Sequence, residues 1–353
     1  MKNIFFIFII SLFVFSVSIT LSGCGGGIRT VAAGSSSYKT YTYTVGSGPS
    51  GIAISPGGSV WVTNFYDNTV TELSSQGAVI GTDTVGIGPA GIAVAPDGNI
   101  WVANTGGSSS IGGSVTELSS QGAVIGTYTV GIGPTGIAVA PDGNIWVANA
   151  GNAVIGSSVT ELSPSGDILT DTGYNAVGHG SKAIAVAPDG NIWVANWGTY
   201  TPTGSKGGSV TELSSQGVLL GTYTVGSGSG IGPSGIAISP GGGVWVANFY
   251  DNTVTELSSQ GAVLGTYTAG SGPEPNPDAV AVDPVNGDIW ISNWGMGNVI
   301  GNTVTELSSQ GVLLGTYTVG SGPAGIAVAP GGGVWVANEN SNTVTEIVKT
   351  ANP

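Results

Sequence analysis

The sequence is poor in the residues from which most enzymes and charged interfaces are built. Its 353 residues include one histidine, His179, and one cysteine, Cys24, so no disulfide can form within the chain. Charged residues make up 7% of the chain, far below the quarter that is usual in globular proteins. The 20 acids outnumber the 6 bases and give a net charge of −14. Nucleic acid is therefore not expected as a partner, because binding its phosphates needs clustered bases.

Amphipathic patterns of helical period are missing from the chain after its first two dozen residues. In their place are 63 glycines, mostly at turns, and short runs rich in Val, Ile, Thr, Tyr and Trp. The hydrophobic content of 41% is enough to build a core, which argues against disorder. These features predict an all-β protein with antiparallel strands.

A unit of four short β runs recurs seven times. The runs are separated by Pro-Asp-Gly, Gly-Gly or Ser-Gln-Gly turns. The spacing of 40 to 52 residues is typical of propeller blades, which contain four strands each. The repeat outweighs the length, which alone would favour two domains. The first run of each unit begins with a small residue, at Gly51, Gly91, Gly136, Ala183, Gly235, Ala279 and Gly325.

The two ends of the repeat array complement each other. The seventh unit ends after its third run, at residues 343–348, and an isolated fourth run stands before the first unit, at residues 38–45. Pairing the two would hide strand edges that otherwise invite association. We therefore predict a seven-bladed β-propeller over residues 38–353, with four antiparallel strands per blade, closed by the N-terminal strand pairing with the last blade.

The first two dozen residues carry a separate signal. Lys2 and an apolar run at residues 4–19 precede Leu21-Ser22-Gly23-Cys24, which resembles a bacterial lipoprotein signal peptide with its lipobox. The resemblance implies removal of residues 1–23, lipidation of Cys24 and a flexible tether over residues 24–37. It implies an exported protein anchored by lipid in the bacterial cell envelope, at the outer membrane or cell surface. A transmembrane anchor is the alternative, although the apolar run is short for spanning.

From about Pro49 the repeats resemble those of NHL-repeat propellers and are similar to streptogramin lyases. The resemblance is clearest in GPAGIAVAPDGNIWVAN from Gly88 and GPTGIAVAPDGNIWVAN from Gly133. Streptogramin lyases catalyse an elimination with a histidine pair and magnesium, and lactonase relatives hold a metal with Glu, Asn and Asp. A single histidine cannot form the pair. The acid that closes the second strand in NHL repeats is here Asn64, Asn104, Asn149, Asn196, Asn248, Asn293 and Asn338. We therefore expect no catalytic residues, no metal and no cofactor.

Two further residue types recur once per unit. We expect the seven tryptophans to pack between blades, at Trp61, Trp101, Trp146, Trp193, Trp245, Trp290 and Trp335. The glutamates of the third run are predicted to be structural and to be cross-strand neighbours of the tryptophans, with the indole as a candidate hydrogen-bond donor. A cation-binding ring is the alternative. The glutamates are Glu72, Glu117, Glu161, Glu212, Glu256, Glu306 and Glu346.

The connections that differ between units are the best candidates for a binding site. Those between the second and third runs, and between one unit and the next, vary in sequence and should emerge on one face, whereas the other turns hardly vary. His179 is expected in a solvent-exposed loop of that face, which also carries Met296. The predicted ligand-binding residues are aromatic: Phe65, Tyr66, Trp197, Tyr200, Phe249, Tyr250 and Trp294.

The sequence thus favours a lipid-anchored envelope propeller that acts as a noncatalytic binding or scaffolding module. Its ligand would be an envelope protein or a glycan, whose apolar sugar faces stack on Trp and Tyr. An enzyme of the lyase or lactonase type is the alternative, and a structural surface coat is a third possibility. Free drift of duplicated loops would explain the aromatic residues without any ligand.

Overall fold

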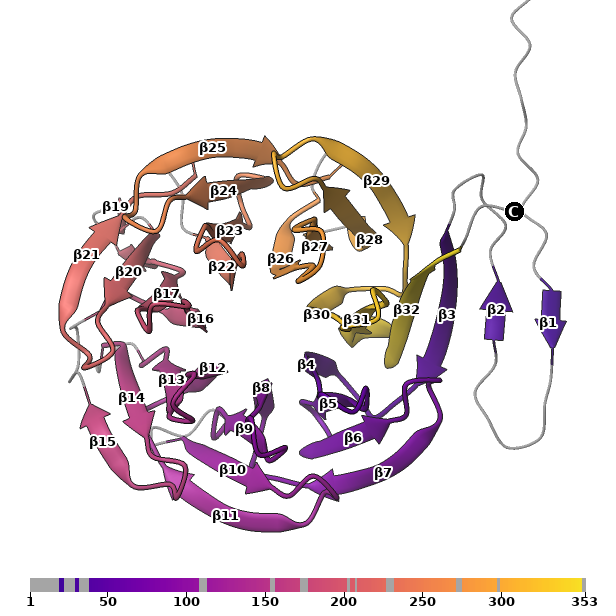
Figure 1. Cartoon of the computed structure of the whole chain (residues 1–353), viewed down its shortest axis with the longest axis horizontal. Helices are drawn as coiled ribbons and strands as arrows, with labels where there is room; N and C mark the ends of the chain where they lie inside the picture. Colours follow the sequence, from indigo (N-terminus) through magenta and orange to yellow (C-terminus); the bar gives the residue numbers. More distant parts are fainter. Residues whose placement is uncertain are drawn as a thin grey trace, which may run out of the picture.

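Seven four-stranded sheets form a closed ring around a central channel (Figure 1). The computed structural model describes residues 19–21, 29–31, 38–107, 113–152, 156–171, 177–201, 204–206, 208–226, 232–270, 275–296 and 299–350. The helix within these residues is the single 3₁₀ turn η1 (Glu339–Ser341). The predicted all-β, seven-bladed propeller is confirmed.

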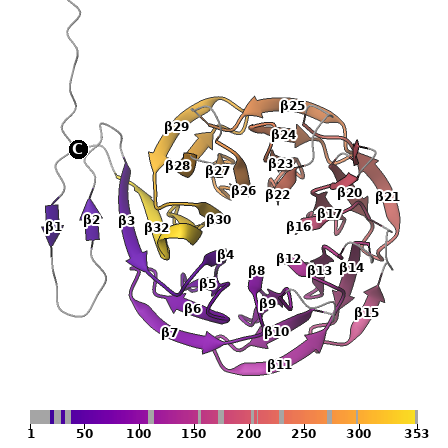
Figure 2. The same cartoon turned by 180° about the vertical axis from the view of Figure 1, so that it is seen from behind.

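Each blade is an antiparallel sheet of four strands, which we name A, B, C and D from the channel outward. Figure 2 shows the same ring from behind. Blades 1 to 3 follow one another along the chain. Their strands are β4 (Pro49–Ile54), β5 (Val60–Asn64), β6 (Thr69–Leu73) and β7 (Val79–Thr84); β8 (Pro89–Val94), β9 (Ile100–Asn104), β10 (Ser114–Leu118) and β11 (Val124–Thr129); and β12 (Pro134–Val139), β13 (Ile145–Asn149), β14 (Ser158–Leu162) and β15 (Ile168–Asp171).

Blades 4 to 6 repeat the pattern, and blade 4 carries an additional hairpin, β18 (Thr199–Thr201) and β19 (Gly204–Lys206). A separate pair, β1 (Ile19–Leu21) and β2 (Arg29–Val31), lies outside the ring. The strands of blades 4 to 6 are β16 (Ser181–Val186), β17 (Ile192–Asn196), β20 (Ser209–Leu213) and β21 (Leu219–Tyr223); β22 (Pro233–Ile238), β23 (Val244–Asn248), β24 (Thr253–Leu257) and β25 (Val263–Thr268); and β26 (Pro277–Val282), β27 (Ile289–Met296), β28 (Val299–Leu307) and β29 (Leu313–Thr318).

Blade 7 is assembled from both ends of the ring. Strands β30 (Pro323–Val328), β31 (Val334–Asn338) and β32 (Thr343–Lys349) come last in the chain, and β3 (Tyr38–Thr44) supplies the outer strand. The register between β3 and β32 runs without interruption from one end of β3 to the other. The hydroxyl of Tyr43 donates a hydrogen bond of 2.9 Å to Glu346 Oε2. The predicted closure by the N-terminal strand is confirmed.

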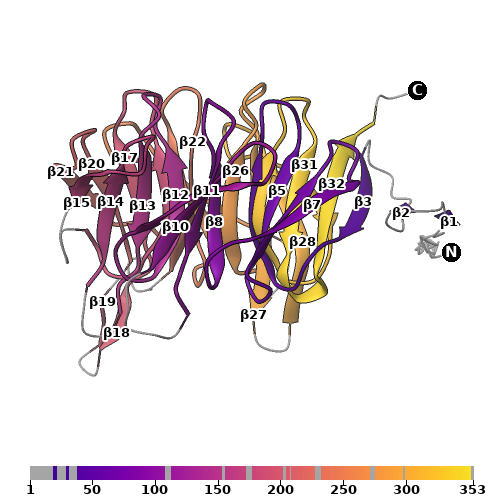
Figure 3. The same cartoon turned by 90° about the horizontal axis from the view of Figure 1, so that it is seen from below.

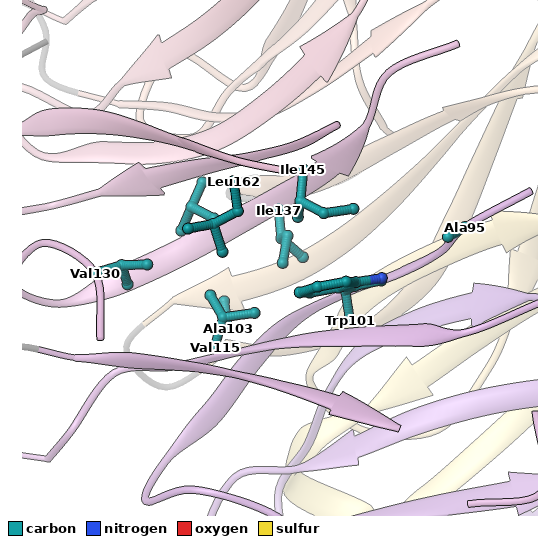
Figure 4. Close-up of a cluster of buried hydrophobic side chains, with 9 residues drawn as sticks. Ala95, Trp101, Ala103, Val115, Val130, Ile137, Ile145 and Leu162 are labelled. Carbon is teal, nitrogen blue, oxygen red and sulfur yellow. The ribbon is translucent and has the colours of Figure 1, made fainter. Parts of the chain in front are cut away.

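The core lies between blades. Trp101 of blade 2 is 1% exposed and packs against Ile137, Ile145 and Leu162 of blade 3 (Figure 4). The equivalent tryptophan of every blade is buried in the same way, as predicted. Each indole removes on the order of 200 Å² of largely apolar surface from water. The ring is therefore held together by seven similar seams.

The repeated glutamates belong to these seams. Trp101 and Glu117 are opposite each other in neighbouring strands, which confirms their predicted cross-strand pairing. The donors to the carboxylate are the Tyr128 hydroxyl at 2.8 Å and the Asn99 amide at 2.9 Å, rather than the indole that the sequence suggested. The tyrosine ring lies over the indole, so its hydroxyl reaches the carboxylate on the same face of the sheet.

The N-terminal predictions fall mostly on residues outside the described ranges. Cys24 is among them, as are most of the predicted signal peptide and tether. Within the part of the chain that the structure describes, no helix has the length and hydropathy needed to cross a bilayer.

Candidate functional site

The variable connections gather on one face of the ring, which we call the loop-rich face. The hairpin of β18 and β19 and the end of the β27–β28 hairpin project from it (Figure 3). Each connection between strands B and C is bonded to the loop that enters its own blade, as where Phe65 N–H donates to Gly48 O and Trp197 N–H to Gly180 O. The prediction that both kinds of connection share a face is confirmed.

The fold sets two rings of side chains around the channel on this face. The outer ring follows the asparagine that ends each strand B and consists of Phe65, Thr105, Ala150, Trp197, Phe249, Trp294 and Glu339. The inner ring, which we call the channel mouth, is the second residue of each strand A: Ser50, Ala90, Thr135, Lys182, Ser234, Asp278 and Ala324. The inner ring and the residues beneath it line a cavity of about 320 Å³.

Lys182 and Asp278 form an ion pair at the channel mouth. The Lys182 ammonium in blade 4 lies 2.5 Å from Asp278 Oδ1 in blade 6, and the two side chains are 36% and 17% exposed. This is the one ion pair among the described residues. The Lys182 Nζ also lies 4.6 Å from the ring centroid of Trp197 and 5.8 Å from that of Phe249. A carboxylate and two aromatic faces thus hold one ammonium group.

Three of the predicted aromatic residues form one cluster beside this ion pair. The Trp197 ring centroid lies 5.3 Å from that of Phe249 and 5.3 Å from that of Tyr250. Phe249 is buried, whereas Tyr250 is 37% exposed. Trp197 is half-buried. The cluster therefore has a packed base and one exposed ring.

A second group joins blades 7 and 1. The Tyr66 hydroxyl donates a hydrogen bond of 3.3 Å to Glu339 Oε1, and the Phe65 and Tyr66 rings meet edge to face at 5.3 Å. Burial raises the pKa of the Glu339 carboxyl above its usual value, and Asp278 adds to the increase, although Tyr66 and Lys182 oppose it. The charge of Glu339, its hydrogen bond and burial together raise the pKa of Tyr66. Tyr66 is 64% exposed and is the most accessible ring of this group.

The remaining predicted residues are less closely associated with these groups. Trp294 is half-buried in β27, and its backbone N–H donates to the backbone carbonyl of Asn276. Tyr200 lies in β18 opposite Ser205, but its side chain, like that of Met296, is outside the described part of the structure. His179 is half-buried rather than fully exposed, and its backbone carbonyl accepts a hydrogen bond from Gly198 N–H.

The sequence interpretation missed the three charged residues of the site: Lys182, Asp278 and Glu339. A signal for them was present. Lys182 and Asp278 are the charged residues at the second position of strand A, where the other blades have Ser, Thr or Ala. Glu339 is the charged residue at the position that is Phe, Trp, Thr or Ala elsewhere. A comparison of equivalent positions between the seven units would have identified all three residues.

The residues present do not fit the magnesium site that the resemblance implies. The chain has a single histidine, in the loop before blade 4. Within the described residues, no three His, Cys, Asp or Glu side chains are grouped so that they could hold a metal ion. At the channel mouth, one of the two nearby carboxylates is already paired with Lys182.

Fold and site together define a seven-bladed β-propeller that gathers acids and aromatic rings at one end of its channel. The chain belongs to the Virginiamycin B lyase family, whose model matches residues 35–347. None of the curated proteins with which the sequence was compared matches it.

Solved structures similar to this chain include lyases and a different enzyme. A streptogramin B lyase shares 20% identity over 88% of this chain and 97% of its own, with a TM-score of 0.74. A catalytically inactive virginiamycin B lyase variant from Staphylococcus aureus, with quinupristin, shares 18% over 88% and 99%, with a TM-score of 0.73. Hydrazine synthase of Kuenenia stuttgartiensis shares 22% over 86% and 96%, with a TM-score of 0.72. At these identities the likeness establishes the fold alone.

Proposed function

We propose that this protein is a noncatalytic binding module that takes an envelope protein or a glycan at the channel mouth of its loop-rich face. One observation carries the proposal. Three side chains that depart from the repeat, Lys182, Asp278 and Glu339, come from blades far apart in the sequence and meet beside Trp197. Uniform blades would suffice for a scaffold alone, so the local departures point to recognition.

The exposed aromatic rings of the site are available to contact a ligand. Tyr66 and Tyr250 are exposed next to buried or half-buried neighbours, so each offers a rigid apolar face at little entropic cost. The carboxylates and the Lys182 ammonium stand beside these faces and can bond to hydroxyl or amide groups. Such a mixture suits a sugar ring or a polar peptide segment.

Binding to a glycan array and to peptides from envelope proteins tests this role. The double variant Tyr66→Ala, Tyr250→Ala is expected to lose the ligand that the unaltered ring retains. The matched control is Ile80→Ala, Leu264→Ala, because these side chains are 57% and 60% exposed on the outer strands. Equal binding by all three proteins would remove the loop-rich face as the site.

Anchoring in the envelope is part of the same proposal and has its own test. If Cys24 is lipidated, the full chain labels with a clickable fatty acid and sediments with membranes. Cys24→Ser is then expected to abolish the label. Labelling that persists in this variant would contradict lipidation at Cys24.

A lyase is the second candidate function, and membership of the Virginiamycin B lyase family favours it. Glu339 would then be the group to examine first, since its pKa is raised at the channel mouth. Incubation with quinupristin, followed by mass spectrometry, distinguishes the possibilities. Elimination leaves the mass of the linearised product unchanged, whereas hydrolysis by a lactonase adds the mass of one water molecule. Turnover that is lost in Glu339→Gln would replace the binding proposal with an enzyme.

A further inference from the structure

The channel mouth already holds one ammonium group, that of Lys182. Its partners are a carboxylate oxygen of Asp278 at 2.5 Å and the face of Trp197 at 4.6 Å. Carboxylates combined with aromatic faces are the general means by which proteins hold ammonium groups. The chain itself thus shows that this part of the loop-rich face accommodates such a group.

A second carboxylate beside this pair has no cation of its own within ion-pair distance among the described residues. Glu339 is half-buried, and its hydrogen-bond donor is the Tyr66 hydroxyl at 3.3 Å. Its pKa is raised by burial and by Asp278, as expected for a carboxylate without a close counter-charge. The exposed ring of Tyr66 lies at its side. Glu339 and Tyr66 therefore repeat the combination of carboxylate and aromatic ring that surrounds Lys182.

Most of the charges around Glu339 have the same sign as its own. Among the described side chains of the channel mouth and the B–C connections, four are acids and one is a base. The acids are Asp67, Asp251, Asp278 and Glu339, and Asp67 and Asp251 each directly follow an exposed tyrosine. An excess of acids on one face raises the local concentration of cations there.

We propose that the ligand of the loop-rich face is recognised through an ammonium group, which binds Glu339 with Tyr66 at its side. Asp278 supplies further negative charge, and Lys182 limits the affinity because its own charge opposes the incoming one. This inference rests on the proposed binding function and specifies its ligand chemistry. An amino sugar and a lysine side chain both carry the group.

Two pairs of probes isolate the ammonium group and separate its sources. The first pair is the tetramer of glucosamine and its fully N-acetylated counterpart. The second pair is the peptide acetyl-Gly-Lys-Gly-amide and the same peptide with an Nε-acetylated lysine. Titration calorimetry at about pH 6 keeps the lysine charged. Residues 38–353 serve as the protein, since they contain every strand of the closed ring.

The expected result is that the charged member of at least one pair binds and that acetylation abolishes the binding. Glu339→Gln should weaken it by about tenfold, because an ionic hydrogen bond becomes a neutral one. Lys182→Met should strengthen it, since the opposing charge is removed. Asp142→Asn, an acid on the opposite face, is the control and should leave the affinity unchanged.

Three outcomes would overturn the inference. Equal binding of charged and acetylated probes would leave the binding function standing without an ammonium site. Loss of binding in Lys182→Met would contradict the opposing role of Lys182 and show that the site needs this side chain. If none of the four probes binds, the ammonium inference fails, and the array experiment with Tyr66 and Tyr250 still decides the binding function separately.

Discussion

The phenol ring of Tyr128 stacks on the indole of Trp101, with 5.6 Å between the centroids and 24° between the planes, and its hydroxyl bonds to Glu117. The arrangement joins strands B, C and D of one blade. It recurs with Tyr43 over Trp335, Tyr223 over Trp193, Tyr267 over Trp245 and, more tilted, Tyr317 over Trp290. Blade 1 lacks it, because Asp83 occupies the tyrosine's position in the register.

Restoring the tyrosine in blade 1 should stabilise the ring. Burial raises the pKa of the Asp83 carboxyl, so a charged group is poorly placed there. Asp83→Tyr would stack on Trp61 and donate to Glu72, and we expect a gain of about 1 kcal/mol in the free energy of unfolding. Denaturant titration measures it, with Asp83→Ala as the control. A gain no larger than that of the alanine variant would contradict the stacking.

The inner strands leave no room for a side chain at Gly51. A Cβ at this position would lie 2.2 Å from the carbonyl oxygen of Ala90 in the next blade. Gly51→Ala should therefore force blades 1 and 2 apart and lower the free energy of unfolding by about 1 to 3 kcal/mol. Gly241→Ala is the matched control, since nothing lies within 4 Å of its Cβ position. Equal stability of the two variants would disprove the crowding.

Removing residues 1–45 should prevent closure. Blade 7 would lose its outer strand, and Tyr43, which is 4% exposed, would leave the cluster that contains Trp335 and Val344. We expect aggregation or a broad thermal transition, measured by light scattering and circular dichroism. Removal of residues 1–37 keeps β3 and should leave a single sharp transition. Cooperative unfolding of both truncated chains would show that closure is dispensable.

Acidification toward about pH 5 should stabilise the protein. Burial raises the pKa of four carboxyls, those of Asp83, Asp288, Glu306 and Glu339. A carboxyl whose pKa is higher in the folded state favours folding below its unfolded pKa of about 4, and this contribution is lost as the pH rises through the folded value. The melting temperature should therefore be higher at about pH 5 than at about pH 7.5. A lower one would refute the expectation, and Glu339→Gln should reduce the difference.

Alkaline pH should destabilise the folded protein by ionising its partly buried tyrosines. Burial, followed by the neighbouring glutamates, raises the pKa of Tyr128 and Tyr223 to about 12. Unfolded tyrosine ionises near pH 10, so the stability contributed by these neutral phenols is present below about pH 10 and is lost up to about pH 12. In an alkaline titration, the absorbance of tyrosinate and the circular dichroism of the fold should change over the same pH range. Ionisation of Tyr128 near pH 10 in an intact ring would contradict this.

Much of the architecture could be predicted from the sequence because the repeat is local and periodic. The strand runs, the displaced run at residues 38–45 and the Trp101–Glu117 pairing follow from alternation and turn spacing. The ion pair between Lys182 and Asp278 could not, because the residues are 96 positions apart and meet through the curvature of the ring. The role of Tyr128 was also missed, since it depends on how one ring lies over another.

The pairing of β3 with β32 also affects the order in which the protein can be made. The outer strand of blade 7 leaves the ribosome before any blade exists, and Glu346, the partner of Tyr43, follows 303 residues later. Until then every nascent chain is an open arc with an apolar edge at each end. A message cut short before β32 yields a product that cannot close, and its unpaired blade edges stay accessible to proteases and chaperones.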